Sequence, residues 1–164
     1  MIKSGAIGTS ALFEFLLDER ADRKDIDVRV VSSGSKMKPE QAEDVVKRML
    51  EYKPELIIWI SPNLAAPGPT KARELLAKCG VPIIMVSDGV SIKIKDELEQ
   101  QGFGYILVKG DPMIGAHREF LDPIEMAIFN SDIIKVLAIT GAFRIIQIEL
   151  NKTINTIKTG KKLE

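Results

Sequence analysis

Short apolar runs alternate with amphipathic or charged stretches along the first two thirds of the chain. Residues 56–60 are apolar without interruption, which is typical of a central parallel strand that helices cover on both faces. Residues 26–31 alternate between apolar and polar side chains, as a half-buried strand does. The pattern predicts strands at 1–3, 26–31, 56–60, 81–86 and 103–108, with helices at 11–17, 39–52, 70–79 and 90–101. Because strands and helices alternate, we expect an α/β fold of three αβα layers around a mostly parallel open sheet.

The last third of the chain predicts C-terminal helices rather than further strands. Asp122 followed by Pro123 is a helix start, since aspartate caps the first turn and proline is tolerated at its first position. Thr140 and Gly141 predict a break, after which a second helix runs through Leu150. We therefore expect an α/β ligand-binding domain at residues 1–121. A C-terminal helical segment at 122–164 would pack on that domain or on a partner subunit.

Each predicted strand ends in a loop of small, polar or proline residues, after positions 3, 31, 60, 86 and 108. The carboxyl ends of parallel strands share one edge of a sheet, and open α/β sheets bind ligands there. Three prolines, Pro62, Pro67 and Pro69, restrict the loop after residue 60. That loop is either a shaped part of a binding cleft or a rigid surface turn.

The glycine turn at Gly5 and Gly8 leads into a helix that Thr9 or Ser10 would cap, an arrangement suited to an anionic group. Its spacing lacks the third glycine of a dinucleotide fingerprint. Asp88, Lys109 and Asp111 follow the last two predicted strands and are candidates for ligand contact. The alternative is turn formation or helix capping for Asp88 and Asp111, and a solvated position at the edge of the sheet for Lys109. The candidate cofactor-binding residues are Gly5, Gly8, Thr9, Ser10, Ser61, Pro62, Asn63, Ala65, Pro67, Gly68, Asp88, Lys109 and Asp111.

Composition narrows the chemistry. The 164 residues carry 23 basic and 23 acidic side chains, so net charge gives no case for nucleic acid or an anionic membrane as partner. A single cysteine, Cys79, and a single histidine, His117, give no recognisable metal site. No apolar run reaches membrane-spanning length, and we expect a cytoplasmic protein. Without a known catalytic set, we assign no catalytic residue and favour a reaction whose chemistry a cofactor carries, such as hydride transfer.

Eight segments of the chain match one pattern: Gly5–Ser10, Leu16–Arg23, Ser61–Asn63, Ala65–Pro69, Lys71–Leu76, Asp111–Ala116, Arg118–Pro123 and Phe129–Asp132. Together they resemble one archaeal family, the coenzyme F420-dependent methylenetetrahydromethanopterin dehydrogenases. The resemblance covers nearly the whole chain, and the loop after Ile60 is its most specific part.

The resemblance implies reversible hydride transfer between methylenetetrahydromethanopterin and coenzyme F420, a step of methanogenesis, with F420 as co-substrate, no metal, and a homo-oligomeric enzyme. The chain departs from the family at Ala6, where asparagine is common. It also begins as though inside the first strand and stops well before the family's usual end, so we expect a form truncated at both ends. The alternative is a truncated, non-catalytic binding or oligomerisation module of the same family.

Overall fold

The structure, a computed structural model, describes residues 1–5, 8–18, 24–109 and 122–161. Five strands form one sheet in the order β2-β1-β3-β4-β5, and every neighbouring pair is parallel. The strands are β1 (Ile2–Lys3), β2 (Val31–Ser32), β3 (Ile57–Ile60), β4 (Ile83–Asp88) and β5 (Gly104–Val108). The α/β fold with a parallel open sheet is confirmed.

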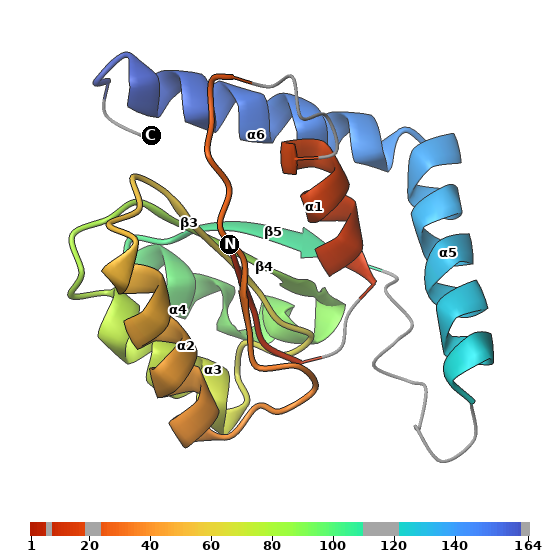
Figure 1. Cartoon of the computed structure of the whole chain (residues 1–164), viewed down its shortest axis with the longest axis horizontal. Coiled ribbons are helices and arrows are strands. Elements are labelled where there is room, and N and C mark those ends of the chain that lie inside the picture. The colour runs from red at the N-terminus through yellow and green to blue at the C-terminus, as the bar shows by residue number, and fades with distance from the viewer. Residues whose placement is uncertain (6–7, 19–23, 110–121, 162–164) are drawn as a thin grey trace.

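Helices cover both faces of this sheet, giving three layers (Figure 1). On one face lie α2 (Pro39–Glu51), α3 (Pro67–Leu76), the 3-10 helix η1 (Gly89–Ile94) and α4 (Lys95–Gln100). On the other lie α1 (Thr9–Asp18) and α6 (Ala142–Lys158). Trp59 of β3 is buried in the core between the sheet and α2 and α3, whereas Ile60 is buried in the core between the sheet and α1 and α6. Successive strand side chains alternate between the two faces in this way. The uninterrupted apolar run of β3 is thus explained by burial on both sides.

Two predicted boundaries are wrong in informative ways. Residues 26–31 were expected to form a strand, but β2 contains Val31 and Ser32 alone, because these are the residues that pair with Ile2 and Lys3 of β1. The helix expected from Thr70 begins at Pro67 instead. Prolines fit the first turn of a helix because its N–H groups have no intrahelical acceptor. Part of the proline-rich loop is therefore the start of α3.

The C-terminal helices form where the sequence predicted them. Asp122 caps α5 (Pro123–Ile139) by accepting bonds from the N–H groups of Ile124 and Glu125, each at 2.8 Å. Gly141, at φ 81°, separates α5 from α6. Leu150 of α6 is buried in the same core as α1 and the sheet. Among the described residues, no helix has the length and apolar character needed to span a membrane.

Candidate functional site

The predicted site residues that the structure describes lie at the carboxyl edge of the sheet, around the point where β1 and β3 lie side by side. The chain leaves β1 for α1 on one face and leaves β3 for α3 on the other. In open parallel sheets such a switch of direction opens a ligand-binding crevice. The N–H of Ser4 donates to the carbonyl of Ile60 at 2.9 Å, so both strand-end loops begin at the same level.

Gly5 allows three loops to close on one another. It adopts φ 90°, and a Cβ there would lie 2.6 Å from Met37 Sδ and 2.8 Å from Pro62 Cδ. Its N–H donates to the Gly34 carbonyl at 3.0 Å, which adds the loop after β2. A side chain at this position would have to displace both neighbours and adopt a strained backbone. Backbone packing alone therefore explains why glycine occupies position 5, without any contact to a ligand.

The loop after β3 is held from inside the protein. The Asn63 side-chain oxygen accepts a bond from the Ala65 N–H at 3.0 Å, which forms a local turn. The Leu64 N–H donates to Ser91 Oγ at 2.9 Å, and Ser91 Oγ lies 2.7 Å from Ser87 Oγ. Ser87 and Ser91 are completely buried. This serine pair ties the loop to β4 and η1, so the loop is a fixed surface.

Gly68 anchors the start of α3 to the loop before α2. Its N–H donates to the Met37 carbonyl at 3.1 Å, and a Cβ on it would lie 2.2 Å from that oxygen. No side chain fits between these two backbones. Met37 therefore contacts two of the three glycines of the predicted site, Gly5 and Gly68, although the sequence analysis did not select it.

Two buried hydroxyl groups lie at the strand switch. Ser4 directly follows β1 and Ser61 directly follows β3, and the register of the two strands places them opposite each other. Both residues are 0% exposed, and neither hydroxyl has a hydrogen-bond partner among the described residues. Such groups are uncommon in folded proteins and call for an explanation. Ser61 was predicted from the sequence; Ser4 was missed, although a small polar residue directly after the first strand was the available signal.

Gly8, Thr9 and Ser10 lie at the start of α1, and all three are buried. The helix begins at Thr9, so Thr9 and Ser10 occupy its first turn. The positive end of the α1 dipole thus faces the carboxyl edge of the sheet, where the anionic group was predicted.

Asp88 and Lys109 come together at the ends of β4 and β5. Asp88 is paired in register with Val108, and a Cβ on Gly89 would lie 3.8 Å from Lys109 Cγ. The Asp88 carboxylate accepts a bond from the Gly89 N–H and caps η1, so the capping role is observed. Lys109 is exposed. Asp111, like His117, lies outside the described residues.

The remaining candidates divide by exposure. Pro62 and Gly68 are buried, Asn63 and Ala65 are half-buried, and Pro67 is exposed. The predicted candidates that the structure describes thus present hydroxyls, backbone groups, the Asp88 carboxylate and the Lys109 ammonium group at this edge. Within the ranges that the structure describes, no group of three or more metal-ligating side chains occurs. Such an edge can bind, orient and shield a ligand.

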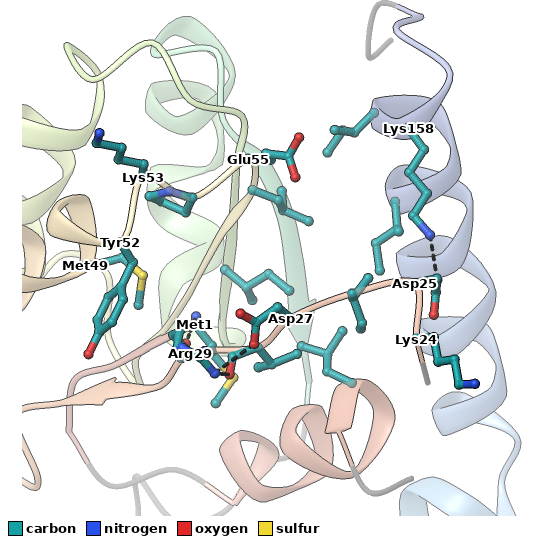
Figure 2. A pocket seen from close by; sticks show the side chains of 18 residues that line it. Met1, Lys24, Asp25, Asp27, Arg29, Met49, Tyr52, Lys53, Glu55 and Lys158 are labelled. Atoms are coloured by element: carbon teal, nitrogen blue, oxygen red, sulfur yellow. Dashed lines mark hydrogen bonds and ion pairs between the residues drawn. The ribbon is translucent and has the colours of Figure 1, made fainter. Parts of the chain in front are cut away.

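The shifted pKa values lie elsewhere. On the surface of α4 and β5, the Tyr105 hydroxyl donates to Glu99 Oε1 at 2.6 Å, and Lys95 Nζ lies 3.4 Å from the same oxygen. The bond from Tyr105, followed by the charge of Lys95, lowers the pKa of Glu99. A cavity of about 590 Å³ opens at the opposite, amino edge, lined by Met1, residues 24–29 and 52–56, and by α6 (Figure 2). None of the predicted site residues lines it.

Comparison with known proteins gives one consistent family. Residues 1–164 match the family model described as methylene-5,6,7,8-tetrahydromethanopterin dehydrogenase. The F420-dependent methylenetetrahydromethanopterin dehydrogenase of Methanocaldococcus jannaschii is 58% identical over 165 residues, covering 100% of this chain and 60% of that protein. The enzyme of the same name from Methanothermobacter marburgensis is 56% identical, covering 100% of this chain and 59% of that protein.

A solved structure gives the same result in three dimensions. It shows an F420-dependent methylene-tetrahydromethanopterin dehydrogenase in complex with methylene-tetrahydromethanopterin and coenzyme F420. The TM-score is 0.92 at 50% identity, and the match covers 98% of this chain and 58% of that one. The chain therefore spans about 60% of the length of the curated relatives it matches.

Proposed function

The chain belongs to the methylene-5,6,7,8-tetrahydromethanopterin dehydrogenase family, and we propose that it acts in the reversible transfer of a hydride between methylenetetrahydromethanopterin and coenzyme F420. One observation carries this proposal: nearly the whole chain superposes on a relative whose structure holds both of these molecules. The named relatives are dehydrogenases, so they lend no support to a non-catalytic module.

The residues at the carboxyl edge suit a site that positions its ligands. When bound, coenzyme F420 supplies the deazaflavin ring that takes up or gives back the hydride. The chain itself contributes a rigid loop after β3 and the buried hydroxyls of Ser4 and Ser61. Because hydride transfer depends on the orientation of two partners and on exclusion of water, such a fixed surface is what the reaction requires of the protein.

We propose three roles for the predicted residues. The first turn of α1 and the glycines before it would hold an anionic or polar group, the loop after β3 would shape the shared cleft, and the ends of β4 and β5 would form its rim. These sets are Gly5, Gly8, Thr9 and Ser10; Ser61, Pro62, Asn63, Ala65, Pro67 and Gly68; and Asp88, Lys109 and Asp111. Gly5, Asn63 and Gly68 also have the structural roles described above.

A turnover assay tests the proposal directly. Purified protein is mixed with methylenetetrahydromethanopterin and coenzyme F420, and the loss of the oxidised deazaflavin absorbance is followed. We expect catalysed loss of that absorbance. No turnover by protein shown to be folded, by circular dichroism and cooperative unfolding, would refute the enzymatic function.

A pair of serine variants tests the site itself. Ser61→Ala removes a buried hydroxyl that has no protein partner, so stability should stay the same or rise, while ligand affinity falls by up to roughly tenfold if the hydroxyl binds a ligand. Ser91→Ala is the matched control, because its hydroxyl is bonded to the Leu64 N–H and should be needed for stability. Unchanged affinity and turnover in Ser61→Ala would exclude Ser61 from the ligand contacts.

The homo-oligomer is also part of this proposal. Six large apolar side chains of α5 and α6 are more than half exposed: Ile124, Ile128, Val136, Ile139, Ile145 and Ile148. An apolar surface of this kind commonly packs against another subunit. Light scattering should show a mass above that of one chain, and Ile139→Lys should lower it. A monomer at all concentrations would contradict this part.

The division of the chain and its location remain proposals as well. We propose that residues 1–121 bind the ligands and that residues 122–164 complete the core and contribute to subunit contacts, in a protein of the cytoplasm. Burial of Leu137, Ile146, Leu150 and Ile154 beside α1 supports packing of this helical segment on the α/β part.

A further inference from the structure

A buried hydrogen bond ties the loop after β3 to a distant part of the chain. Within this loop, the N–H groups of Ala65 and Ala66 donate to Asn63, at 3.0 Å and 3.2 Å, and shape the turn locally. The N–H of Leu64 instead donates to the side chain of Ser91 in η1, at 2.9 Å. Leu64 and Ser91 are both 0% exposed, so water does not compete for this bond. The Ser91 hydroxyl thus holds the loop from inside the protein.

This bond fixes the orientation of the Leu64 peptide group, which burial of the Leu64 side chain does not. That side chain lies in the same core as Trp59 and Leu76. Apolar burial is non-directional, whereas a hydrogen bond weakens steeply as its angle closes. The residues on either side of Leu64 are Asn63 and Ala65, which are half-buried candidates for ligand contact. Rotation of the Leu64 peptide group would therefore move both candidates.

The Ser91 hydroxyl is itself held by Ser87 of β4. The two Oγ atoms lie 2.7 Å apart, and Ser87 is also 0% exposed. A hydroxyl group has one proton to donate and two lone pairs that can accept. Whichever serine donates to the other, Ser91 Oγ keeps a lone pair for the Leu64 N–H. The three groups form a buried chain of hydrogen bonds that runs from β4 through η1 to the loop.

The 3-10 helix η1 turns Ser91 towards the interior. It is anchored at its start, where the carboxylate of Asp88 accepts a bond from the Gly89 N–H. Val90 and Ile92, on either side of Ser91, are each 39% exposed, whereas Ser91 is buried. The hydroxyl of Ser91 is therefore engaged by protein groups, and the outer face of η1 is left to its neighbours.

We propose that Ser91, held by Ser87, is a positioning residue for the hydride transfer, which acts through Leu64 on the loop after β3 and touches neither ligand. This inference rests on the proposed function of the carboxyl edge. Hydride transfer depends on the distance and orientation of two bound partners, and misplacement by about 1 Å can cost about a hundredfold in rate. A hydroxyl that fixes one wall of the cleft should therefore affect the rate within the bound complex more than the affinity.

The test compares the steady-state kinetics of the original chain with those of three variants, each shown to be folded by cooperative urea unfolding. Ser91→Ala removes the acceptor of the Leu64 N–H. Ser87→Ala leaves that acceptor in place and removes its partner, so it serves as the test if Ser91→Ala does not fold. Arg73→Met is the matched control, because it removes a buried polar contact between the second half of α3 and α4 and should also lower stability.

We expect kcat of Ser91→Ala to fall by roughly tenfold to a hundredfold, while KM changes by less than about threefold. With deuterium at both positions of the methylene carbon of the substrate, the isotope effect on kcat should rise in Ser91→Ala, because hydride transfer becomes slower relative to ligand release. Ser87→Ala should lower kcat by a smaller factor, about threefold, and Arg73→Met should leave kcat within about twofold of the original chain.

Equal kcat in Ser91→Ala and Arg73→Met would overturn the inference, since Ser91 would then act on stability alone. So would a rise in KM at unchanged kcat, which would make Ser91 a determinant of affinity. Absence of turnover in the original chain would instead refute the proposed function.

A second readout decides the positioning role without turnover. Coenzyme F420 is titrated into each folded protein, and the circular dichroism of the deazaflavin absorbance band reports how the bound ring is oriented. The inference requires a changed band in Ser91→Ala at an unchanged dissociation constant, together with an unchanged band in Arg73→Met. Any other result in this titration would overturn it.

Discussion

The contact between Gly68 and Met37 can be tested by one methyl group. In Gly68→Ala the new Cβ would lie 2.2 Å from Met37 O and 2.8 Å from Lys38 O, both of them backbone atoms. The start of α3 must therefore move away from the loop before α2, which weakens the bond from the Gly68 N–H to Met37 O. The rest of the helix keeps its sequence, so the effect reports on this contact alone.

The size of the effect follows from two costs and one gain in the free energy of unfolding. Overpacking a tight contact costs about 1–3 kcal/mol, and the weakened hydrogen bond adds about 1 kcal/mol. Alanine in place of glycine in a helix recovers up to about 1 kcal/mol. We therefore expect a net loss of about 1–3 kcal/mol in the free energy of unfolding, measured from urea titrations without any ligand.

Gly104→Ala is the matched control. A Cβ at Gly104 would lie 3.6 Å from Ile83 O, which is an ordinary contact, and its backbone is not in the left-handed region. Alanine in a strand is favoured over glycine by roughly 0.5–1 kcal/mol, so this variant should be neutral or slightly more stable. If Gly68→Ala unfolds at the same urea concentration as Gly104→Ala, the two backbones do not hold each other in place as described.

Three further measurements address other parts of the fold. Because the pKa of the Met1 amine falls from 8.0 to about 6 on folding, the unfolded chain binds more protons than the folded chain between these pH values. Raising the pH from 6 to 8 should therefore add about 2 kcal/mol to the free energy of unfolding, measured by urea titrations at the two pH values. Acetylation of the Met1 amine should abolish this gain. Asp122→Ala should lower stability by about 1 kcal/mol in thermal unfolding, because it removes the cap of α5. Asp132→Ala breaks an exposed ion pair within the same helix and should cost at most about 0.5 kcal/mol. Equal losses in the two variants would show that the cap does not stabilise the helix. Arg73→Met should lower the free energy of unfolding by about 1–3 kcal/mol in urea titrations, because the buried Arg73 guanidinium joins α3 to α4. Glu97→Gln, at the exposed end of that contact, should lower it by less than about 1 kcal/mol. A larger loss for Glu97→Gln than for Arg73→Met would refute this account.

Local patterns predicted the parts of the fold that depend on local chemistry. The uninterrupted apolar run of β3 required burial on both faces, and the Asp122–Pro123 pair marked the start of α5. Strand β2 was predicted too long because a strand exists only where a partner pairs with it. Alternation at residues 26–31 records which side chains are apolar, whereas pairing depends on how far β1 extends beside them.

In the candidate site, too, local sequence predicted some features, whereas others depend on contacts between distant segments. Its location followed from the order of strands and helices, since all parallel strands end at one edge. The contacts of Met37 with Gly5 and Gly68 could not be predicted, because they join loops that are distant in the sequence. Likewise, the position of Ser4 opposite Ser61 depends on the register between β1 and β3. Sequence identifies the residues available for the edge, and register decides which of them meet.

The strand order also sets a constraint on how the chain folds as it is synthesised. Strand β1 leaves the ribosome before the other four strands, yet it lies inside the sheet, between β2 and β3, and its Ile2 pairs with Trp59 of β3. The first strand must therefore wait, apolar and unpaired on one side, until β3 has emerged and the loop between them has closed. Pulse-labelled hydrogen exchange should show β1 protected no earlier than β3. Although β1 is synthesised before β3, it is among the last parts of the sheet to be fully paired.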